Sequence, residues 1–143
     1  MARVRRDAFL DHLSEVPLFS ALSKRDLQLV ARAAEDVKVE AGKVLVTEGS
    51  AGAEFFVIVD GKARVTRRGR KVAGLGPGQF FGELALLDRA PRNATVVAET
   101  PMELLVLGQR EFAALIDEVP GLAHKLLAGL ARRVRESDAK SVQ

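Results

Sequence analysis

The residues best suited to chemistry lie in one unbroken stretch, residues 80–96, which reads FFGELALLDRAPRNATV. Gly82 lets the backbone turn closely, and Ala85 leaves room for an anion to approach the backbone amides of a short helical turn. Arg92 adds a charge-assisted clamp for phosphate oxygens, and Glu83 can accept a hydrogen bond from a sugar hydroxyl. These residue types in one loop predict a site for a sugar phosphate.

The same residues also have an ordinary interpretation. A glutamate and an arginine in one loop are often solvated or paired with each other, and small residues are common in turns. Leu84, Leu86 and Leu87 fit either interpretation, because they anchor such a turn in a core. The physics of the residues alone leaves both interpretations open.

The composition is that of an ordinary globular chain. It has 143 residues, of which 48% are hydrophobic and 29% are charged, and it contains no cysteine. The lack of cysteine excludes a disulfide framework, a thiolate nucleophile and a Cys-based zinc site, and it fits a reducing cytoplasm. No apolar run is long enough to span a membrane, and the basic N-terminus lacks the apolar region of a signal peptide. We expect one cytoplasmic domain, residues 1–143, with no metal site and no cofactor.

Basic residues give the chain a net charge of +3 and a sequence pI near 9.6. Their densest groups are three separate clusters, at residues 3–6, 67–71 and 132–135. No aromatic residues interleave with them, so solvated faces and terminal arms explain them better than a nucleic-acid surface does. We therefore expect no DNA partner.

The hydrophobic pattern divides the chain into three parts. Residues 1–36 are helical, with Ser23 placed to N-cap a helix over residues 23–35. Residues 37–108 alternate polar and apolar positions between frequent turns, which favours a sandwich or barrel of short strands. Residues 109–138 return to helical spacing, with helices at 109–118 and from Pro120 to about residue 138.

The last of these helices carries an apolar stripe at three- and four-residue steps. Its members are Leu122, Leu126, Leu127, Leu130 and Val134. The stripe packs either into the core or against a partner, such as another copy of the chain.

Two motifs resemble the signatures of the cyclic-nucleotide-binding domain family. Residues 81–86, FGELAL, followed by Arg92 and Ala94, match the second signature, the phosphate-binding cassette. The first signature corresponds to these positions: residues 45–49 (LVTEG), Gly52, residues 55–58 and Gly61. With helices in the expected places, the resemblance covers roughly residues 16–138.

The resemblance implies a mainly β fold with flanking helices. This fold is an eight-stranded β-roll, a jelly-roll-like double-stranded β-helix, with N-terminal helices and C-terminal lid helices. Carried over, Arg92 matches the phosphate arginine and Glu83 the acceptor for the ribose 2′-hydroxyl. The surrounding ligand-binding positions are Gly82, Leu84, Ala85, Asn93 and Ala94.

Two positions depart from the family pattern. Asn93 follows the arginine where the family usually has Ser, Thr or Ala; a threonine there is associated with a preference for cGMP. The amide of Asn93 can donate or accept, so it leaves the choice of base open. Many members stack an aromatic lid residue on the base, but no aromatic residue follows Phe112. Arg133 or Arg132 can lay a guanidinium over the purine instead, and Arg133 is our choice by its distance from Pro120. The alternative is that both arginines face solvent.

These observations predict a non-enzymatic sensor and regulatory domain that binds cAMP in preference to cGMP. The ligand is expected to shift the C-terminal helix, and the expected partners are an effector protein and a second copy bound through that helix. His12 and His124 lie in no nucleophile or metal motif, so we expect no enzyme activity. Two alternatives are a non-binding scaffold that keeps the fold and a DNA-binding regulator that lacks its helix-turn-helix domain. The second is disfavoured, because the sequence ends where that domain begins in the family.

Overall fold

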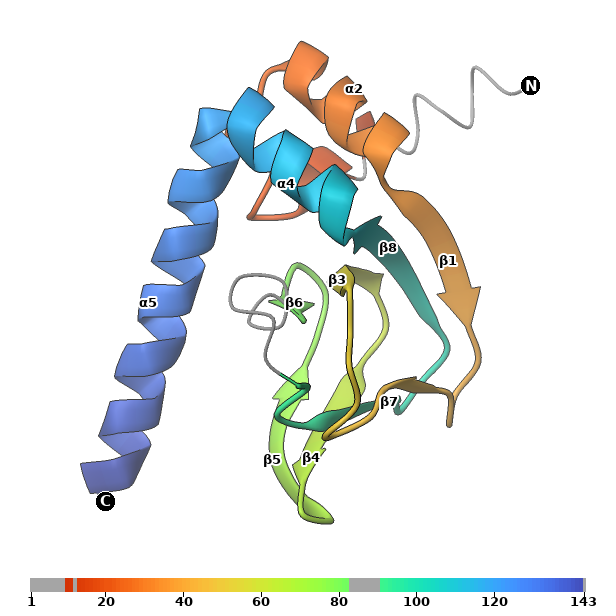
Figure 1. The fold of residues 1–143 in the computed structure, drawn as a ribbon, viewed down its shortest axis with the longest axis vertical. Helices are drawn as coiled ribbons and strands as arrows, with labels where there is room; N and C mark the ends of the chain where they lie inside the picture. The colour runs from red at the N-terminus through yellow and green to blue at the C-terminus, as the bar shows by residue number, and fades with distance from the viewer. Residues whose placement is uncertain (1–9, 12, 83–90, 143) are drawn as a thin grey trace.

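The computed structural model describes residues 10–11, 13–82 and 91–142 (Figure 1). The helices are α2 (Lys24–Ala33), α4 (Gln109–Glu118) and α5 (Pro120–Val142), and residues 10–11 and 13–15 are also helical. The strands are β1 (Glu35–Val39), β2 (Val44–Val46), β3 (Glu54–Asp60), β4 (Ala63–Arg67), β5 (Arg70–Leu75), β6 (Phe80–Phe81), β7 (Thr95–Ala98) and β8 (Met102–Gly108). No described helix combines the length and hydropathy needed to cross a bilayer.

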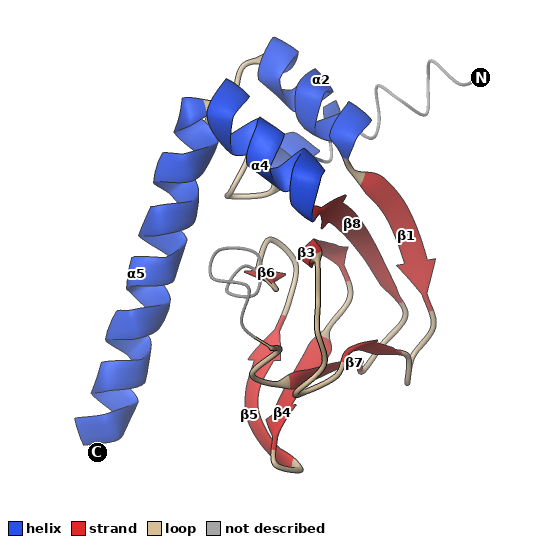
Figure 2. Ribbon diagram, in the orientation of Figure 1, coloured by secondary structure: helices blue, strands red, loops and turns tan. Residues whose placement is uncertain are grey.

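The eight described strands form two antiparallel sheets. Figure 2 shows the strands in red, with the helices in blue beside them. One sheet has the order β1-β8-β3-β6, and the other has the order β2-β7-β4-β5. Both orders place strands that are distant in sequence side by side, as in the pairing of β3 with β8. The predicted eight-stranded β-roll with flanking helices is confirmed.

Strand β3 explains how the layers are held together. All five of its inner residues are buried, so both faces of the strand are covered. Phe55, Val57 and Val59 belong to a core shared with the helices, whereas Phe56 and Ile58 belong to a second core between the two sheets. The period-two alternation of a strand therefore divides its side chains between two hydrophobic cores.

The helices cover one face of the β1-β8-β3-β6 sheet. Helix α2 begins as predicted, because the Ser23 side chain accepts a hydrogen bond from the Asp26 amide at 3.1 Å. Leu27 and Val30 from α2, with Leu115 from α4, lie in the core shared with β3. Helix α5 then runs past the β6 edge of this sheet, as Figure 1 shows.

The observed boundaries differ from the predicted ones at three places. Helix α2 ends at Ala33 rather than Glu35, because residues 35–39 pair with β8 from Glu35 onward. The β-region therefore starts two residues earlier than the predicted residue 37. Strand β6 was not foreseen as a strand, and α5 continues to Val142 rather than to about residue 138.

Candidate functional site

Arg92 is the one charged side chain that the fold buries among the described residues, with 7% of its surface exposed. Its Nη1–H donates to the backbone oxygen of Gly82 at 2.9 Å, and its Nη2–H donates to that of Glu54 at 2.7 Å. Burying a guanidinium is costly unless hydrogen bonds compensate it, and backbone carbonyls supply that compensation here. The guanidinium is thereby held beside Gly82 of the predicted cassette.

Two glycines make room for this guanidinium. A Cβ atom at Gly52 would lie 1.9 Å from Arg92 Nε, and one at Gly82 would lie 2.9 Å from Arg92 Nη1 and 2.6 Å from the Glu54 oxygen. Gly82 also has φ of +93°, a region that favours glycine. Any side chain at Gly52 would have to displace the arginine, so the glycine defines one wall of its socket.

The backbone around Arg92 is fixed as firmly as its side chain. The Arg92 amide donates to Ser50 O at 2.9 Å, and the Gly49 amide donates to Arg92 O at 2.7 Å. One turn away, the Glu48 amide donates to the Thr95 hydroxyl oxygen at 2.9 Å. The turn at residues 47–50 therefore holds the segment that carries the arginine, which brings the first predicted motif against the second.

The predicted site residues between Gly82 and Ala94 fall into three groups. The structure brings Gly82 and Arg92 into contact. Ala94, which follows Arg92 by two residues, is buried. Asn93 is exposed, and its backbone oxygen accepts a hydrogen bond from Arg67 Nε–H at 3.0 Å. The predictions for Glu83, Leu84 and Ala85 lie outside the described residues.

Arg133, the predicted lid residue, lies on Phe80. Its Nη2–H donates to the Phe80 backbone oxygen, and its Cζ lies 4.4 Å from the centre of the Phe80 ring. Gly129, one helical turn earlier, brings the backbone of α5 close to the same ring, since a Cβ there would lie 2.9 Å from Phe80 Cζ. Arg133 is thus not simply solvent-facing, and its stacking on a purine remains a prediction.

The two residues of β6 connect this contact to the arginine socket. Phe80 belongs to the core that the helices share, where its ring centre lies 5.6 Å from that of Phe55. Phe81 points into the other core and stacks on Phe56 at 4.7 Å. Gly82, the acceptor for Arg92, follows directly. One short strand therefore contacts α5 on one side and the socket at its end.

The predicted apolar stripe of α5 divides between core and surface. Leu122 and Leu126 are buried, and Leu130 packs against the same core. Leu127 and Val134 are 66% and 59% exposed. The first part of the helix thus serves the core, and an apolar pair remains on its surface.

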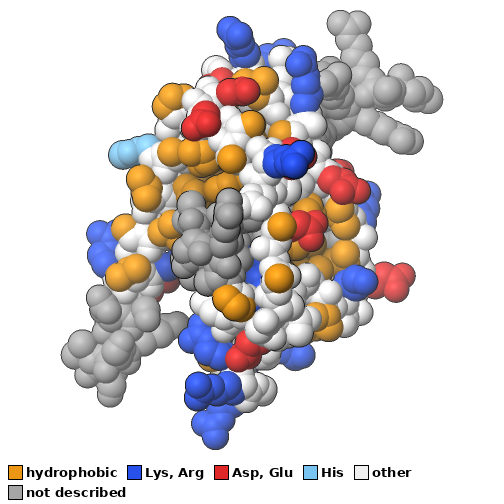
Figure 3. Space-filling view, in the orientation of Figure 1, with side chains coloured by type: hydrophobic (Ala, Val, Ile, Leu, Met, Phe, Trp, Pro, Cys, Tyr) orange, Lys and Arg blue, Asp and Glu red, His pale blue; other side chains and the backbone are white. Residues whose placement is uncertain are grey.

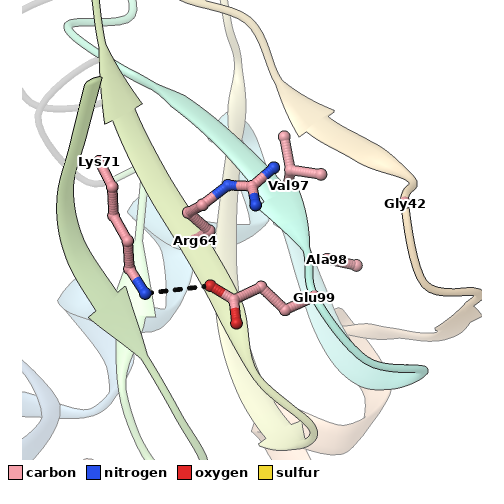
Figure 4. A pocket seen from close by; sticks show the side chains of 6 residues that line it. All are labelled: Gly42, Arg64, Lys71, Val97, Ala98 and Glu99. Carbon is pink, nitrogen blue, oxygen red and sulfur yellow. Dashed lines mark ion pairs between the residues drawn. The ribbon is translucent and has the colours of Figure 1, made fainter. Parts of the chain in front are cut away.

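A shallow hollow of about 480 Å³ lies on the outer face of the second sheet (Figure 4). Its lining consists of Gly42, Arg64, Lys71, Val97, Ala98 and Glu99. Lys71 Nζ lies 3.3 Å from Glu99 Oε1 in an exposed ion pair. The predicted site residues that the structure describes do not line this hollow. No group of three His, Cys, Asp or Glu residues that could hold a metal ion occurs in the described part of the chain.

Sequence reasoning missed several groups that shape the site. The backbone oxygens of Glu54 and Phe80 accept arginine donors, and every residue carries such an oxygen, so no residue type signalled them. Gly52 did carry a signal, because it belongs to the first motif, but its role as a wall for Arg92 needed the fold.

Comparison with known proteins gives a consistent result. The family described as cyclic nucleotide-binding domain matches residues 36–119. The cyclic AMP receptor protein of Thermus thermophilus is 38% identical over 127 residues, covering 85% of this chain and 59% of the relative. A cAMP-dependent protein kinase regulatory subunit of Yarrowia lipolytica is 39% identical over 117 residues, covering 80% of this chain and 31% of the relative.

A solved structure is similar over most of the fold. The crystal structure of Thermus thermophilus catabolite activator protein superposes with a TM-score of 0.78 at 38% identity. The match covers 87% of this chain and 61% of that one. This chain therefore spans less than two thirds of the proteins that it resembles here.

Proposed function

The chain belongs to the family of cyclic nucleotide-binding domains, and we propose that it is a non-enzymatic sensor that binds cAMP in preference to cGMP. The observation that carries the proposal is the buried Arg92 guanidinium, held beside Gly82 by backbone oxygens. The family resemblance gives this arginine the role of phosphate clamp, and a fixed guanidinium suits a ligand that carries one charged cyclic phosphate.

The preference for cAMP rests on the relatives and on the lack of a threonine after Arg92. Asn93 is exposed next to the arginine, at the position where a threonine is associated with cGMP. The relatives reported above are named a cyclic AMP receptor protein and a cAMP-dependent protein kinase regulatory subunit. Glu83 is proposed to accept the ribose 2′-hydroxyl, a role that a 2′-deoxy analogue of cAMP tests directly. A cytoplasmic location also stays a prediction.

The proposed output is a shift of α5. Arg133 and Gly129 contact Phe80, which lies two residues before the Gly82 oxygen that holds Arg92. A ligand that pulls on Arg92 changes the position of β6 and hence the surface on which α5 rests. Such coupling requires that the ligand bind more tightly to the protein with α5 in one position than to the protein with α5 in another.

The proposed partner surface is the exposed part of α5. Leu127 and Val134 are seven residues apart and therefore lie on one face of the helix, which suits a second copy of the chain or a helical segment of an effector protein. Sedimentation of the chain with and without cAMP tests the first of these possibilities.

A second candidate is a scaffold that keeps the fold and binds no nucleotide. The contacts of Arg92 with Gly82 and Glu54 favour it, because a purely structural arginine would make the same two hydrogen bonds. The two candidates differ in whether the protein is stabilised by a ligand.

Thermal unfolding with cAMP, cGMP or AMP distinguishes them. The chain has no Trp or Tyr, so unfolding is followed by calorimetry or a dye. A ligand at one hundred times its dissociation constant adds about 2.7 kcal/mol, which raises the midpoint by about 5–15 °C. We expect a larger rise with cAMP than with cGMP and none with AMP, which lacks the cyclic phosphate. No rise with any of the three at millimolar concentration would favour the scaffold.

A further inference from the structure

The β4–β5 hairpin reaches the candidate site through two of its basic residues. Arg67 Nε–H donates to the backbone oxygen of Asn93 at 3.0 Å. The adjacent Arg68 amide donates to Glu48 Oε1 at 2.9 Å. The hairpin therefore holds both the segment that follows Arg92 and the turn that supports it. Figure 3 shows basic side chains gathered at the hairpin end of the molecule.

The register of β4 explains why Arg67 reaches the site. Ala63 and Val65 pair with Ala98 and Val96 and point into the core between the sheets. Strand side chains alternate, so Arg67 continues that inner row at the end of the strand. Arg64 lies on the other face, where it lines the outer hollow. The two arginines belong to one strand but face opposite sides of the sheet.

Arg67 holds the backbone of Asn93 through one hydrogen bond. Its neighbours are held independently, since Arg92 bonds to residues 49 and 50 and Ala94 is buried. The backbone oxygen of Asn93 instead receives the Arg67 donor, while the residue itself stays exposed. Fixing a carbonyl oxygen fixes its peptide plane and limits the directions in which the adjoining side chain can point. The Asn93 amide can both donate and accept, so its direction decides which edge of a base it meets.

We propose that Arg67 is a positioning residue that sets the choice of base by holding Asn93. It acts through Asn93, while Arg92 supplies the contact with phosphate. The inference rests on the proposed nucleotide-binding function, and it adds a residue outside both family motifs to the groups that determine specificity.

The test is a double-mutant cycle on the ratio of the dissociation constants for cGMP and cAMP, measured by calorimetry. We expect Arg67→Ala and Asn93→Ala each to bring this ratio closer to one by about two- to tenfold, the effect of one hydrogen bond. In the double variant Arg67→Ala should have no further effect on the ratio, because the residue through which it acts is gone. Arg64→Ala removes the same charge from the other face of the strand and should leave the ratio unchanged.

A second measurement does not depend on nucleotide binding. In the ligand-free protein, backbone relaxation by NMR should show greater fast motion at Asn93 in Arg67→Ala but not in Arg64→Ala. If the parent protein binds no nucleotide, the proposed function fails and the role in base choice fails with it; this relaxation result still tests the positioning itself.

Three outcomes would overturn the inference. The first is an equal loss of cAMP and cGMP affinity in Arg67→Ala, which would assign Arg67 to the phosphate or to the fold. The second is the same change in Arg64→Ala, which would indicate a long-range effect of charge. The third is an additive effect of Arg67→Ala on the ratio when Asn93 is already alanine.

Discussion

The arginine socket and the outer hollow hold their charges in opposite ways. In the socket, Arg92 is 7% exposed and bonds to two backbone oxygens, which move only if the strands move. In the hollow, the side chains of Lys71 and Glu99 are 57% and 34% exposed and bond to each other across 3.3 Å. Backbone partners fix the position of a charge, whereas two exposed flexible side chains gain little by pairing. Pre-organisation for a ligand is therefore expected in the socket.

The largest expected effect comes from the two arginines that represent these regions. Arg92→Ala should lower cAMP affinity by about 2–4 kcal/mol, the value of a desolvated charge-assisted contact, whereas Arg64→Ala should change it by less than about 0.5 kcal/mol. Calorimetric titration measures both. Arg92→Lys keeps the charge but loses the paired donors, so its cAMP affinity should lie between those of Arg92→Ala and Arg64→Ala. The lysine variant keeps the prediction testable if Arg92→Ala does not fold. Equal affinity in the parent and Arg92→Ala would mean that the cassette assignment is wrong.

A smaller effect is expected from two glycines, one in the socket and one on β5 opposite Arg64. Gly52→Ala should lower the free energy of unfolding by about 1–3 kcal/mol, because its Cβ overlaps the Arg92 guanidinium. Gly74→Ala is the matched control, since a Cβ at Gly74 meets no atom within 4 Å. Urea unfolding compares them. If the two variants are equally stable, Arg92 can move to make room for the added methyl group, and the socket does not hold the guanidinium rigidly.

The neighbouring arginines of α5 extend the comparison to the helix. Arg133→Ala should destabilise the docking of α5 by about 0.5–1.5 kcal/mol, because it loses both the ring and the carbonyl contact with Phe80. Arg132→Ala removes an exposed arginine and should have little effect. Hydrogen exchange along α5 reports the difference as faster local opening. Faster exchange in both variants would assign the effect to helix charge rather than to Phe80.

The smallest expected effect belongs to the hollow itself. Lys71→Ala and Glu99→Ala should each change the free energy of unfolding by about 0.5 kcal/mol or less, as is usual for an exposed ion pair. Chemical unfolding at low and at high salt measures it. A loss above about 1 kcal/mol that disappears in salt would show that exposed charges on this sheet are more strongly coupled than their geometry indicates.

Local pattern was sufficient to predict most of the fold. The Ser23 cap, the alternation of β4 and the helix at residues 109–118 depend on neighbouring residues, and each was found near its observed place. The start of β1 depends on pairing with β8, about seventy residues away, so the local pattern extended the preceding helix into it. Strand β6 has only two residues, too few for any periodicity to register.

The candidate site was predictable only in part. Arg92 and Gly82 were identified by residue type and motif, and the structure brings them into contact. The acceptors of the two arginines are main-chain oxygens whose positions follow from strand pairing rather than from residue identity. The place of Arg67 likewise follows from the alternation of side chains along β4, in which Ala63 and Val65 face the core between the sheets.

Strand β6 is held more by side chains than by its ladder. It pairs with β3 through two residues, Phe80 and Phe81. Arg133 donates a hydrogen bond to the backbone oxygen of residue 80, and Arg92 donates one to that of residue 82. The segment 80–82 is thus hydrogen-bonded at each end to an arginine side chain from a different part of the chain. The rate of proteolytic cleavage near this segment, compared between the parent and each arginine variant, would show how much each of the two contacts protects it. If the two contacts break independently, the protein has an intermediate in which only one end of the segment is held.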